Sequence, residues 1–348
     1  MNLDQIKSLF NSFQTGKVPT NFSEIKSGHI NDTFLIETNS DKKFVLQRIN
    51  HKVFLDVPGL VNNKVLVSQH LLKKVTQNDQ KVLEFVPTSE GLFYFLDTHG
   101  NYWNLTYFID NSITYNTCPN ATIAFEGGRV TGEFLRHTSD LDPSELIEVI
   151  PNFHNMAFRF EQFQQALDSA NDERMKNASK EIFFCRERKE EMLMLNKLKE
   201  SGKIPVRVTH NDTKISNILF NANQEGLVMI DTDTVMPGIL HYDFGDAIRT
   251  ICSTAVEDEQ DLNKVHFNME FYESYKRGFL EGLGTGLTPI ERNYLPLAVK
   301  TMIFIMGLRF LTDYLNNDVY YKTNYHNHNL VRAKNQFQLL KSFENQSL

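Results

Sequence analysis

The pattern of apolar residues changes about a third of the way along the chain. Up to residue 108, short segments rich in β-branched and aromatic residues are separated by turn formers, which is typical of strands. Beyond that point, apolar residues recur three and four positions apart, which is typical of helices, over 121–137, 143–168, 177–200, 262–282, 289–316 and 328–343. The sequence therefore predicts an α+β protein with a small β-rich lobe over 1–108 and a larger, mainly helical lobe over 109–348.

One helix is expected inside the β-rich lobe, over residues 59–75. Leu60, Lys64, Val67 and Leu71 follow the helical spacing there. Strands are expected on both sides of this helix, at 44–49, 92–96 and 105–109. The small lobe is thus predicted to be a sheet that carries one inserted helix.

Composition and charge narrow the classes of function. The 348 residues are 41% hydrophobic and 23% charged, with a net charge of −7, so a sequence-independent nucleic-acid binder, which is normally basic, is not expected. Three cysteines, each 67 residues from the next, match neither a disulfide framework nor a zinc site. The N-terminus lacks the apolar stretch of a secretory signal, and apolar clusters such as 295–299 and 303–306 fall short of the roughly 20 residues of a bilayer span. We expect a soluble cytoplasmic protein without a membrane partner, and its oligomeric state stays open.

A polar insert over 204–239 interrupts the helical lobe, and its first part has the pattern H-x-D-x-x-x-x-N. His210, Asp212 and Asn217 occupy the three fixed positions. Kinase catalytic loops take this form. Transfer of a phosphoryl group from ATP needs a carboxylate that accepts the proton of the acceptor hydroxyl, and oxygen ligands that hold Mg²⁺ on the phosphates. We predict Asp212 as the catalytic base, Asn217 as a metal ligand and Lys214 as a cation near the transferring phosphate, whereas His210 is expected to bond the loop backbone.

A second metal ligand is expected where a short strand ends after this loop. Residues 227–230 form such a strand, and Asp231 ends it, 19 residues after Asp212. Asp233 is the alternative ligand. The segment Asp243-Phe244-Gly245 has the letters of a kinase metal motif, but it lies 31 residues after Asp212, beyond a Pro-Gly break. We therefore expect Asp243 to cap and anchor a helix that begins near Gly245.

The β-rich lobe offers few residues for nucleotide phosphates. Segment 27–34, which contains Gly28, is similar to a phosphate-covering hairpin, and an ordinary β-turn explains it equally well. No phosphate loop of the form G-x-x-x-x-G-K-[ST] occurs in the sequence. Strand 44–49, where kinases carry a lysine, has Gln47 and Arg48 instead. Arg48 is the expected phosphate contact because arginine binds phosphate in a bidentate manner, and Lys43 is the alternative if the register differs.

The motifs together resemble one family over nearly the whole chain. The sequence resembles the aminoglycoside-phosphotransferase-like kinases and, within them, the bacterial N-acetylhexosamine 1-kinases. The segments that carry this resemblance are 28–31, 45–50, 150–155, 210–217, 231–238, 243–249, 307–314 and 318–321. The resemblance implies a protein-kinase-like two-lobed fold with the active site in the cleft, and ATP and Mg²⁺ as cofactors.

The resemblance also implies a reaction and the residues that perform it. The γ-phosphate of ATP would pass to the anomeric hydroxyl of GlcNAc or GalNAc, with Asp212 as the base and Asn217 and Asp231 as magnesium ligands. The residues expected at the nucleotide are Gly28, His29, Asn31 and Arg48, and those expected at the sugar are His29, Asn31, Asp212, Arg309 and Tyr320. The chain departs from protein kinases at the strand lysine and at the helix glutamate, where 59–75 offers Asn62 and Asn63.

Three other functions fit parts of the sequence. A kinase of another small hydroxyl compound, such as choline or an aminoglycoside, shares the core motifs, although a polycationic acceptor needs clustered acidic residues and 320–328 are nearly neutral. A sulfatase-type hydrolase is disfavoured because the proline of Cys118-Pro119 lies one position too early. A non-catalytic pseudokinase is disfavoured because the metal ligands and the base are retained.

Arg309, in an otherwise apolar helix, either binds a ligand or pairs with a structural carboxylate.

Overall fold

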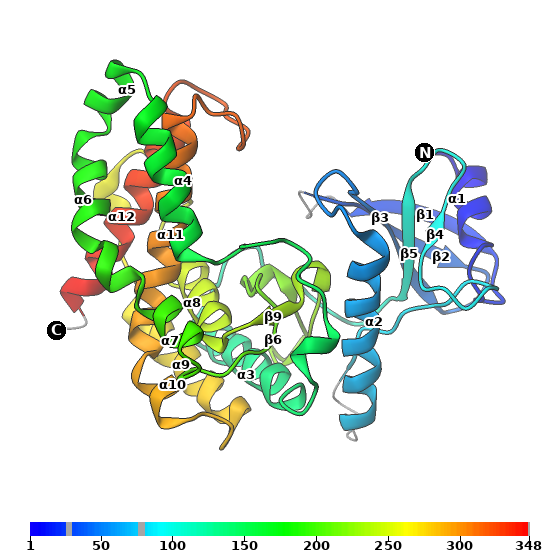
Figure 1. Ribbon diagram of the computed structural model, residues 1–348. Coiled ribbons are helices and arrows are strands. Elements are labelled where there is room, and N and C mark those ends of the chain that lie inside the picture. The colour runs from blue at the N-terminus through cyan, green and yellow to red at the C-terminus, as the bar shows by residue number, and fades with distance from the viewer. Residues whose placement is uncertain (26–29, 76–80, 347–348) are drawn as a thin grey trace. The chain divides into compact units, whose positions relative to one another are not determined.

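The computed structural model describes residues 1–25, 30–75 and 81–346 (Figure 1). It divides into two compact units that are built from separate stretches of the chain. The first unit comprises 1–114, 137–151 and 217–237, and the second unit comprises 115–136, 152–216 and 238–348. An antiparallel sheet dominates the first unit and helices dominate the second, which confirms the predicted α+β class. The chain passes between the two units several times. The predicted lobes, in contrast, divide the chain only once, after residue 108.

The sheet of the first unit has five antiparallel strands in the order β1-β2-β3-β5-β4. Antiparallel pairing places Phe34 of β2 opposite Leu46 of β3, and Leu46 opposite Leu105 of β5. The strands are β1 (Pro19–Ile25), β2 (Asp32–Thr38), β3 (Lys43–Ile49), β4 (Phe95–Leu96) and β5 (Tyr102–Tyr107).

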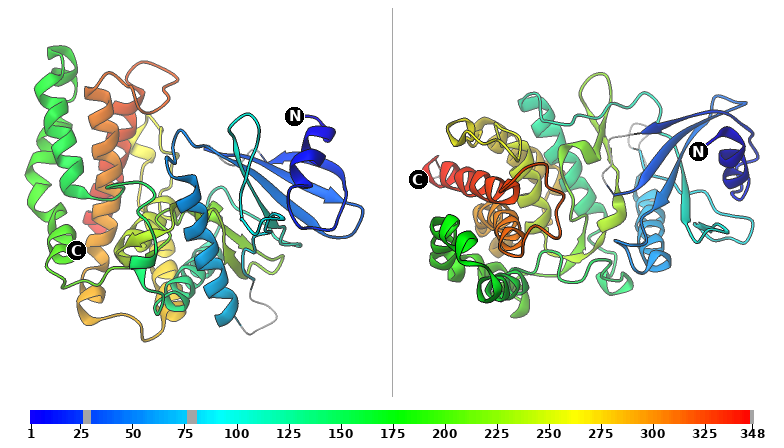
Figure 2. Two further views of the ribbon diagram at one scale, coloured as in Figure 1. Left: turned by 45° about the vertical axis from the view of Figure 1, so that its right-hand side comes forward. Right: turned by 90° about the horizontal axis from the view of Figure 1, so that it is seen from above.

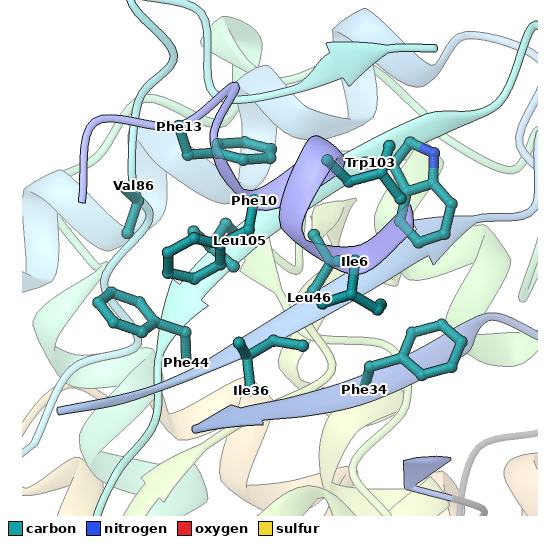
Figure 3. Packing of buried hydrophobic residues seen from close by; sticks show 11 residues of the cluster. Ile6, Phe10, Phe13, Phe34, Ile36, Phe44, Leu46, Val86, Trp103 and Leu105 are labelled. Atoms are coloured by element: carbon teal, nitrogen blue, oxygen red, sulfur yellow. The ribbon is translucent and has the colours of Figure 1, made fainter. Parts of the chain in front are cut away.

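Each face of this sheet packs on its own helix. Helix α1 (Leu3–Phe10) buries Ile6 and Phe10 against Phe44 and Leu46 of β3 and against Trp103 of β5, as Figure 3 shows. Helix α2 (Val57–Lys74) is the helix predicted over 59–75, and it packs on the other face, where Ile49 lies. Because successive residues of a strand point to opposite faces, Gln47 shares the α2 face and Arg48 shares the α1 face.

The first unit also contains a small hairpin, which comes directly after the predicted catalytic loop in the chain. Strand β7 (Ile218–Phe220) pairs with β8 (Gly226–Met229), with Ile218 opposite Met229. Phe220 also bridges Ile113, which ties the hairpin to the end of the strand-rich region. The short turn η3 (Thr232–Thr234) and strand β9 (Met236–Gly238) come next in the chain.

Helix α11 (Leu295–Leu315) forms the centre of the second unit and packs against α4, α8 and α12, which Figure 2 shows around it. Within the described part of the chain, α11 alone is long and apolar enough to cross a membrane. However, 67% of its most apolar 18-residue stretch is buried inside the protein, as expected of a core helix. The other helices of this unit are α3 (Ala121–His137), α4 (Met156–Ser169), α5 (Asp172–Asn177), α6 (Ser179–Met192), α7 (Met194–Glu200), α8 (Leu240–Ile251), α9 (Met269–Leu283), α10 (Pro289–Asn293) and α12 (His328–Gln346).

Three predicted helix starts were wrong. The helix expected over 262–282 begins only at Met269, where Asn268 caps it by accepting a hydrogen bond from the Phe271 amide. The helix expected over 143–168 begins only at Met156, where Asn155 caps it by accepting a hydrogen bond from the Phe158 amide, and Pro143–Glu145 form a single 3-10 turn. The helix expected near Gly245 begins at Leu240. Apolar spacing alone did not mark these three starts, because capping and loop contacts decide where the helices begin.

Helices α3 and α9 of the second unit cross at glycines. A Cβ atom on Gly278 or Gly282 of α9 would overlap a carbonyl oxygen of α3, that of Phe125 or Arg129. The reverse holds for Gly128 and Gly132 of α3, whose Cβ atoms would overlap carbonyl oxygens of α9. The two backbones therefore touch directly, and only glycine fits at the crossing.

Candidate active site

The predicted catalytic loop follows strand β6 (Arg207–Thr209) and is anchored from α8. The carboxylate of Asp243, fully buried in the first turn of α8, accepts the backbone N–H groups of His210 at 2.9 Å and Asn211 at 2.7 Å. Its backbone carbonyl accepts the hydroxyl of Thr213 at 2.6 Å. Burial raises the pKa of Asp243 to about 7, against these two hydrogen bonds. Asp243 thus anchors the predicted catalytic loop rather than the helix end that the sequence suggested.

Asp212 lies on this loop beside a cation. The Lys214 ammonium is 2.9 Å from a carboxylate oxygen of Asp212, and both side chains keep about a third of their surface exposed, 38% and 30%. His210 is fully buried, and its Nδ1 atom accepts the Asp212 amide at 3.3 Å. The geometry gives His210 a backbone contact and gives Asp212 an accessible carboxylate with a positive neighbour.

The two predicted metal ligands lie at the same end of the β7–β8 hairpin in the first unit. Asn217 precedes β7 and Asp231 follows β8, and the amide of Ile230 donates to the Asn217 carbonyl at 2.8 Å. Asp231 has φ 60° and ψ 54°, a left-handed conformation that is uncommon for a residue other than glycine and clusters at functional sites.

An amide oxygen and a carboxylate fit Mg²⁺, which is held in proteins by one or two carboxylates together with substrate phosphates and water. Across 1–25, 30–75 and 81–346, no group of three or more His, Cys, Asp or Glu side chains could hold a metal ion alone. A site completed by the phosphates of a nucleotide is consistent with that donor set.

Asp233, the alternative ligand, is engaged inside the first unit. Its carboxylate accepts the Asn31 side-chain amide and pairs with the Lys64 ammonium. The other end of the Asn31 side chain accepts the Asn50 amide at 2.9 Å. Asn31 therefore links β2, β3 and the turn after Asp231, and both of its polar ends are already used.

The predicted phosphate contacts of the β-rich lobe have different outcomes. Gly28 and His29 lie outside the described residues. Arg48 is on the α1 face of β3, where its Nε atom is 2.6 Å from Asp32 and its guanidinium lies 5.9 Å from the Trp103 ring centre. On the α2 face, Gln47 meets the Lys64 ammonium at 3.3 Å.

Arg309 of α11 and His154 belong to a region of the second unit that contacts the predicted catalytic loop through His154. The Nε2 atom of His154 is 3.2 Å from the Asn211 carbonyl oxygen. Arg309 lies over the rings of Phe153 and Tyr321, 5.6 Å and 5.7 Å from their centres. Throughout the described chain, no carboxylate pairs with Arg309, so the structural-carboxylate explanation of this arginine is not supported.

The loop that carries Tyr320 is fixed through its backbone. Asp313 of α11 accepts the amides of Tyr320 at 2.8 Å and Tyr321 at 2.9 Å, and the side-chain amide of Asn329 at 2.9 Å. The Tyr320 side chain is 72% exposed. The carboxylate of Asp313 therefore holds this loop in place.

The family of the chain follows from comparison with known proteins. The profile of the phosphotransferase enzyme family matches residues 21–285, which is more than half of the chain, and the chain belongs to this family. Three solved structures share its fold over nearly the full length of both chains, at identities that speak only for the fold.

The first of these is a choline kinase from Cryptosporidium parvum Iowa II, with 14% identity, coverage of 99% of this chain and 97% of that one, and a TM-score of 0.62. An aminoglycoside phosphotransferase from Alicyclobacillus acidocaldarius subsp. acidocaldarius has 13% identity, coverage of 97% and 95%, and a TM-score of 0.61. An amicoumacin kinase in complex with AMP-PNP and Ca²⁺ has 12% identity, coverage of 100% and 94%, and a TM-score of 0.62. These similarities confirm the kinase-like fold class.

His154 makes the stability of the protein depend on pH. Burial lowers the pKa of His154 to about 3; the Asn211 contact and Asp212 oppose that shift, and Arg309 and Arg159 add to it. In the unfolded chain, the imidazole binds a proton near its ordinary pKa of about 6.5. Between these values the unfolded state holds more protons, so stability is full above about pH 6.5 and falls as the pH drops towards 3.

We therefore expect the unfolding free energy of the wild type to fall more steeply below pH 6.5 than that of His154→Gln, whose non-titrating side-chain amide can place an N–H donor at the Nε2 position that contacts the Asn211 carbonyl. The difference in slope should approach about 1.4 kcal/mol per pH unit at most. Urea unfolding at pH 4.5, 5.5 and 7 measures it. Because Asp243 is common to both proteins, its opposite pH dependence cancels in the comparison, and parallel slopes would contradict the prediction.

Proposed function

We propose that this protein is an ATP- and Mg²⁺-dependent kinase that phosphorylates the anomeric hydroxyl of N-acetylhexosamines. The observation that supports this most directly is the Asp212–Lys214 pair on a loop anchored by buried Asp243. Membership of the phosphotransferase enzyme family supports the reaction class.

In the proposed reaction, Asp212 accepts the proton of the sugar hydroxyl while the oxygen of that hydroxyl forms a bond to the γ-phosphorus of ATP. The bond to the bridging oxygen breaks, ADP leaves with that electron pair, and Lys214 offsets charge on the transferring group. Asn217 and Asp231 would hold Mg²⁺, which supplies charge neutralisation at the phosphates when bound. Each role follows from residue chemistry and from the loop and hairpin that carry these side chains.

The electrostatics of the acceptor side favour a neutral sugar over a polycation. In the described chain, no carboxylate accepts a hydrogen bond from Arg309. The positive charge of Arg309 helps to lower the pKa of Arg159, so the two guanidinium groups interact electrostatically. Two guanidinium groups would repel an aminoglycoside, whereas sugar hydroxyl and carbonyl oxygens can accept the N–H groups of Arg309. The exposed ring of Tyr320 adds a surface on which a sugar can stack.

The function is tested by phosphorus NMR of the purified protein with ATP, Mg²⁺ and a panel of acceptors: GlcNAc, GalNAc, glucose, galactose, choline and an aminoglycoside. A new resonance coupled to an anomeric proton, formed only with the N-acetylated sugars, is the expected result. Phosphorylation of choline or of the aminoglycoside alone would retain the phosphotransferase and overturn the sugar assignment. No phosphorylated product with any acceptor would contradict the proposed function.

Arg309→Met should raise the KM for the sugar by about tenfold or more and leave the KM for ATP within about twofold. Loss of a hydrogen bond from a charged group costs about 1.5–3 kcal/mol, and about 1.4 kcal/mol corresponds to tenfold. Steady-state kinetics with each substrate varied in turn measures both constants. Arg292→Met removes an exposed arginine from the same unit and serves as the control. A change confined to the ATP constant would contradict the assignment.

A further inference from the structure

Lys64 is a buried cation that the proposed reaction does not yet use. It lies on α2 with a side chain only 4% exposed, paired with Asp233, 3.3 Å from the Gln47 side-chain oxygen and 5.5 Å from the Phe85 ring centre. An ammonium group is costly to bury unless it is paired and hydrogen-bonded. Its presence among the buried residues of α2, which are otherwise uncharged, therefore calls for a specific purpose.

The partner of Lys64 belongs to the turn that presents Asp231. Asp233 is two residues beyond Asp231 in η3, and its carboxylate also accepts the Asn31 side chain. The turn is thus held from α2 and from the start of β2 through one carboxylate group.

The residue before Lys64 holds the far end of the same turn. The Asn63 side-chain amide donates to the carbonyl oxygens of Val235 and Ile147, each at 2.9 Å, and its oxygen accepts the Ile147 amide at 3.0 Å. Asn63 and Lys64, adjacent on α2, therefore fix two points of the segment that follows Asp231. A left-handed aspartate costs conformational free energy and persists only where its surroundings enforce it.

We propose that Lys64, acting through Asp233, is a positioning residue that fixes the Asp231 carboxylate for binding of the metal–nucleotide complex. This inference rests on the proposed function of Asp231. In protein kinases the strand carries the cation and the helix carries the anion. Here the cation is on helix α2, the strand offers neutral Gln47, and the anion lies in the turn after the metal ligand.

The test compares Lys64→Met, Asp233→Asn and the double variant with Lys74→Met. Lys74 lies on the same helix and pairs with exposed Asp140, so its substitution is a matched control for loss of an α2 ion pair. The double variant guards against misfolding, because it removes both buried charges instead of leaving one unpaired. Two readouts are measured: calorimetric binding of ATP with and without Mg²⁺, and amide hydrogen exchange of residues 230–236 in the free protein.

We expect Lys64→Met to weaken Mg·ATP binding about tenfold, to change Mg²⁺-free ATP binding less than twofold, and to speed exchange over 230–236. The double variant should be no worse than the worse single variant, because both residues act through one contact. Lys74→Met should match the wild type in both readouts. Wild-type Mg·ATP affinity and exchange in folded Lys64→Met and double variants would overturn the inference and leave the proposed function intact. Failure of the wild type to bind Mg·ATP would overturn both.

Discussion

Asp212→Asn is expected to lower kcat for phosphoryl transfer by at least about a hundredfold while the Kd for ATP changes little. An amide cannot accept the proton of the acceptor hydroxyl, and general-base catalysis contributes about 10²–10⁴-fold. The substitution keeps the size of the side chain and a hydrogen-bond acceptor for Lys214, which lies 2.9 Å from Asp212. The measurement is a steady-state assay with the acceptor that the panel identifies, together with calorimetric ATP binding.

Asp168→Asn provides the matched control, because Asp168 is an exposed carboxylate of α4 in the same unit. It should have wild-type kcat. Near-normal turnover of Asp212→Asn would remove Asp212 from the role of base, whatever the acceptor.

Asp231→Asn should weaken Mg²⁺-dependent ATP binding by about a hundredfold and abolish turnover in a folded protein. Asparagine tolerates the left-handed conformation of Asp231 better than alanine does, so the loss reports the missing charge rather than backbone strain. A magnesium site built from one carboxylate, one amide and phosphates depends strongly on that carboxylate. Calorimetric titration of ATP at several Mg²⁺ concentrations measures the effect.

Asp243→Asn is the informative comparison, since this residue belongs to the segment with the letters of a metal motif. Its carboxylate receives two backbone N–H groups of the catalytic loop, so its substitution should reduce stability and turnover with Mg²⁺-dependent affinity preserved. The opposite result, with Asp243 essential for Mg²⁺-dependent binding and Asp231 dispensable, would refute the spacing argument from the sequence.

Much of the fold could be predicted because its elements rest on local periodicity. The spacing of Leu60, Val67 and Leu71 predicts α2, and alternation in β3 follows from Phe44 and Leu46. The contact between Asp243 and the His210 amide could not be predicted in the same way, because it joins residues 33 positions apart through the packing of α8. Spacing could discourage a metal role for Asp243 but could not supply its partner.

Lys64 is the residue that the sequence argument missed, although its signal was present. It occupies a position of the apolar stripe of α2, where a charged side chain is out of place unless it has a buried partner. Kinases carry their lysine on the strand, so the sequence predicted Arg48 instead, but the position of Arg48 in β3 puts it on the α1 face with Asp32. The face to which a strand residue points depends on the register of the strand. The sequence alone left that register open, so both Arg48 and Lys43 remained candidates.

The crossing of α3 and α9 limits how this protein can change by mutation. A side chain that clashes with a neighbouring side chain can often be accommodated when the neighbour becomes smaller. At Gly278 and Gly282 the neighbours are carbonyl oxygens of Phe125 and Arg129, which no substitution can shorten. No substitution on α3 should therefore restore stability after a bulky residue is introduced at Gly278 or Gly282. A larger residue at either position can be accommodated only if the two helices move apart.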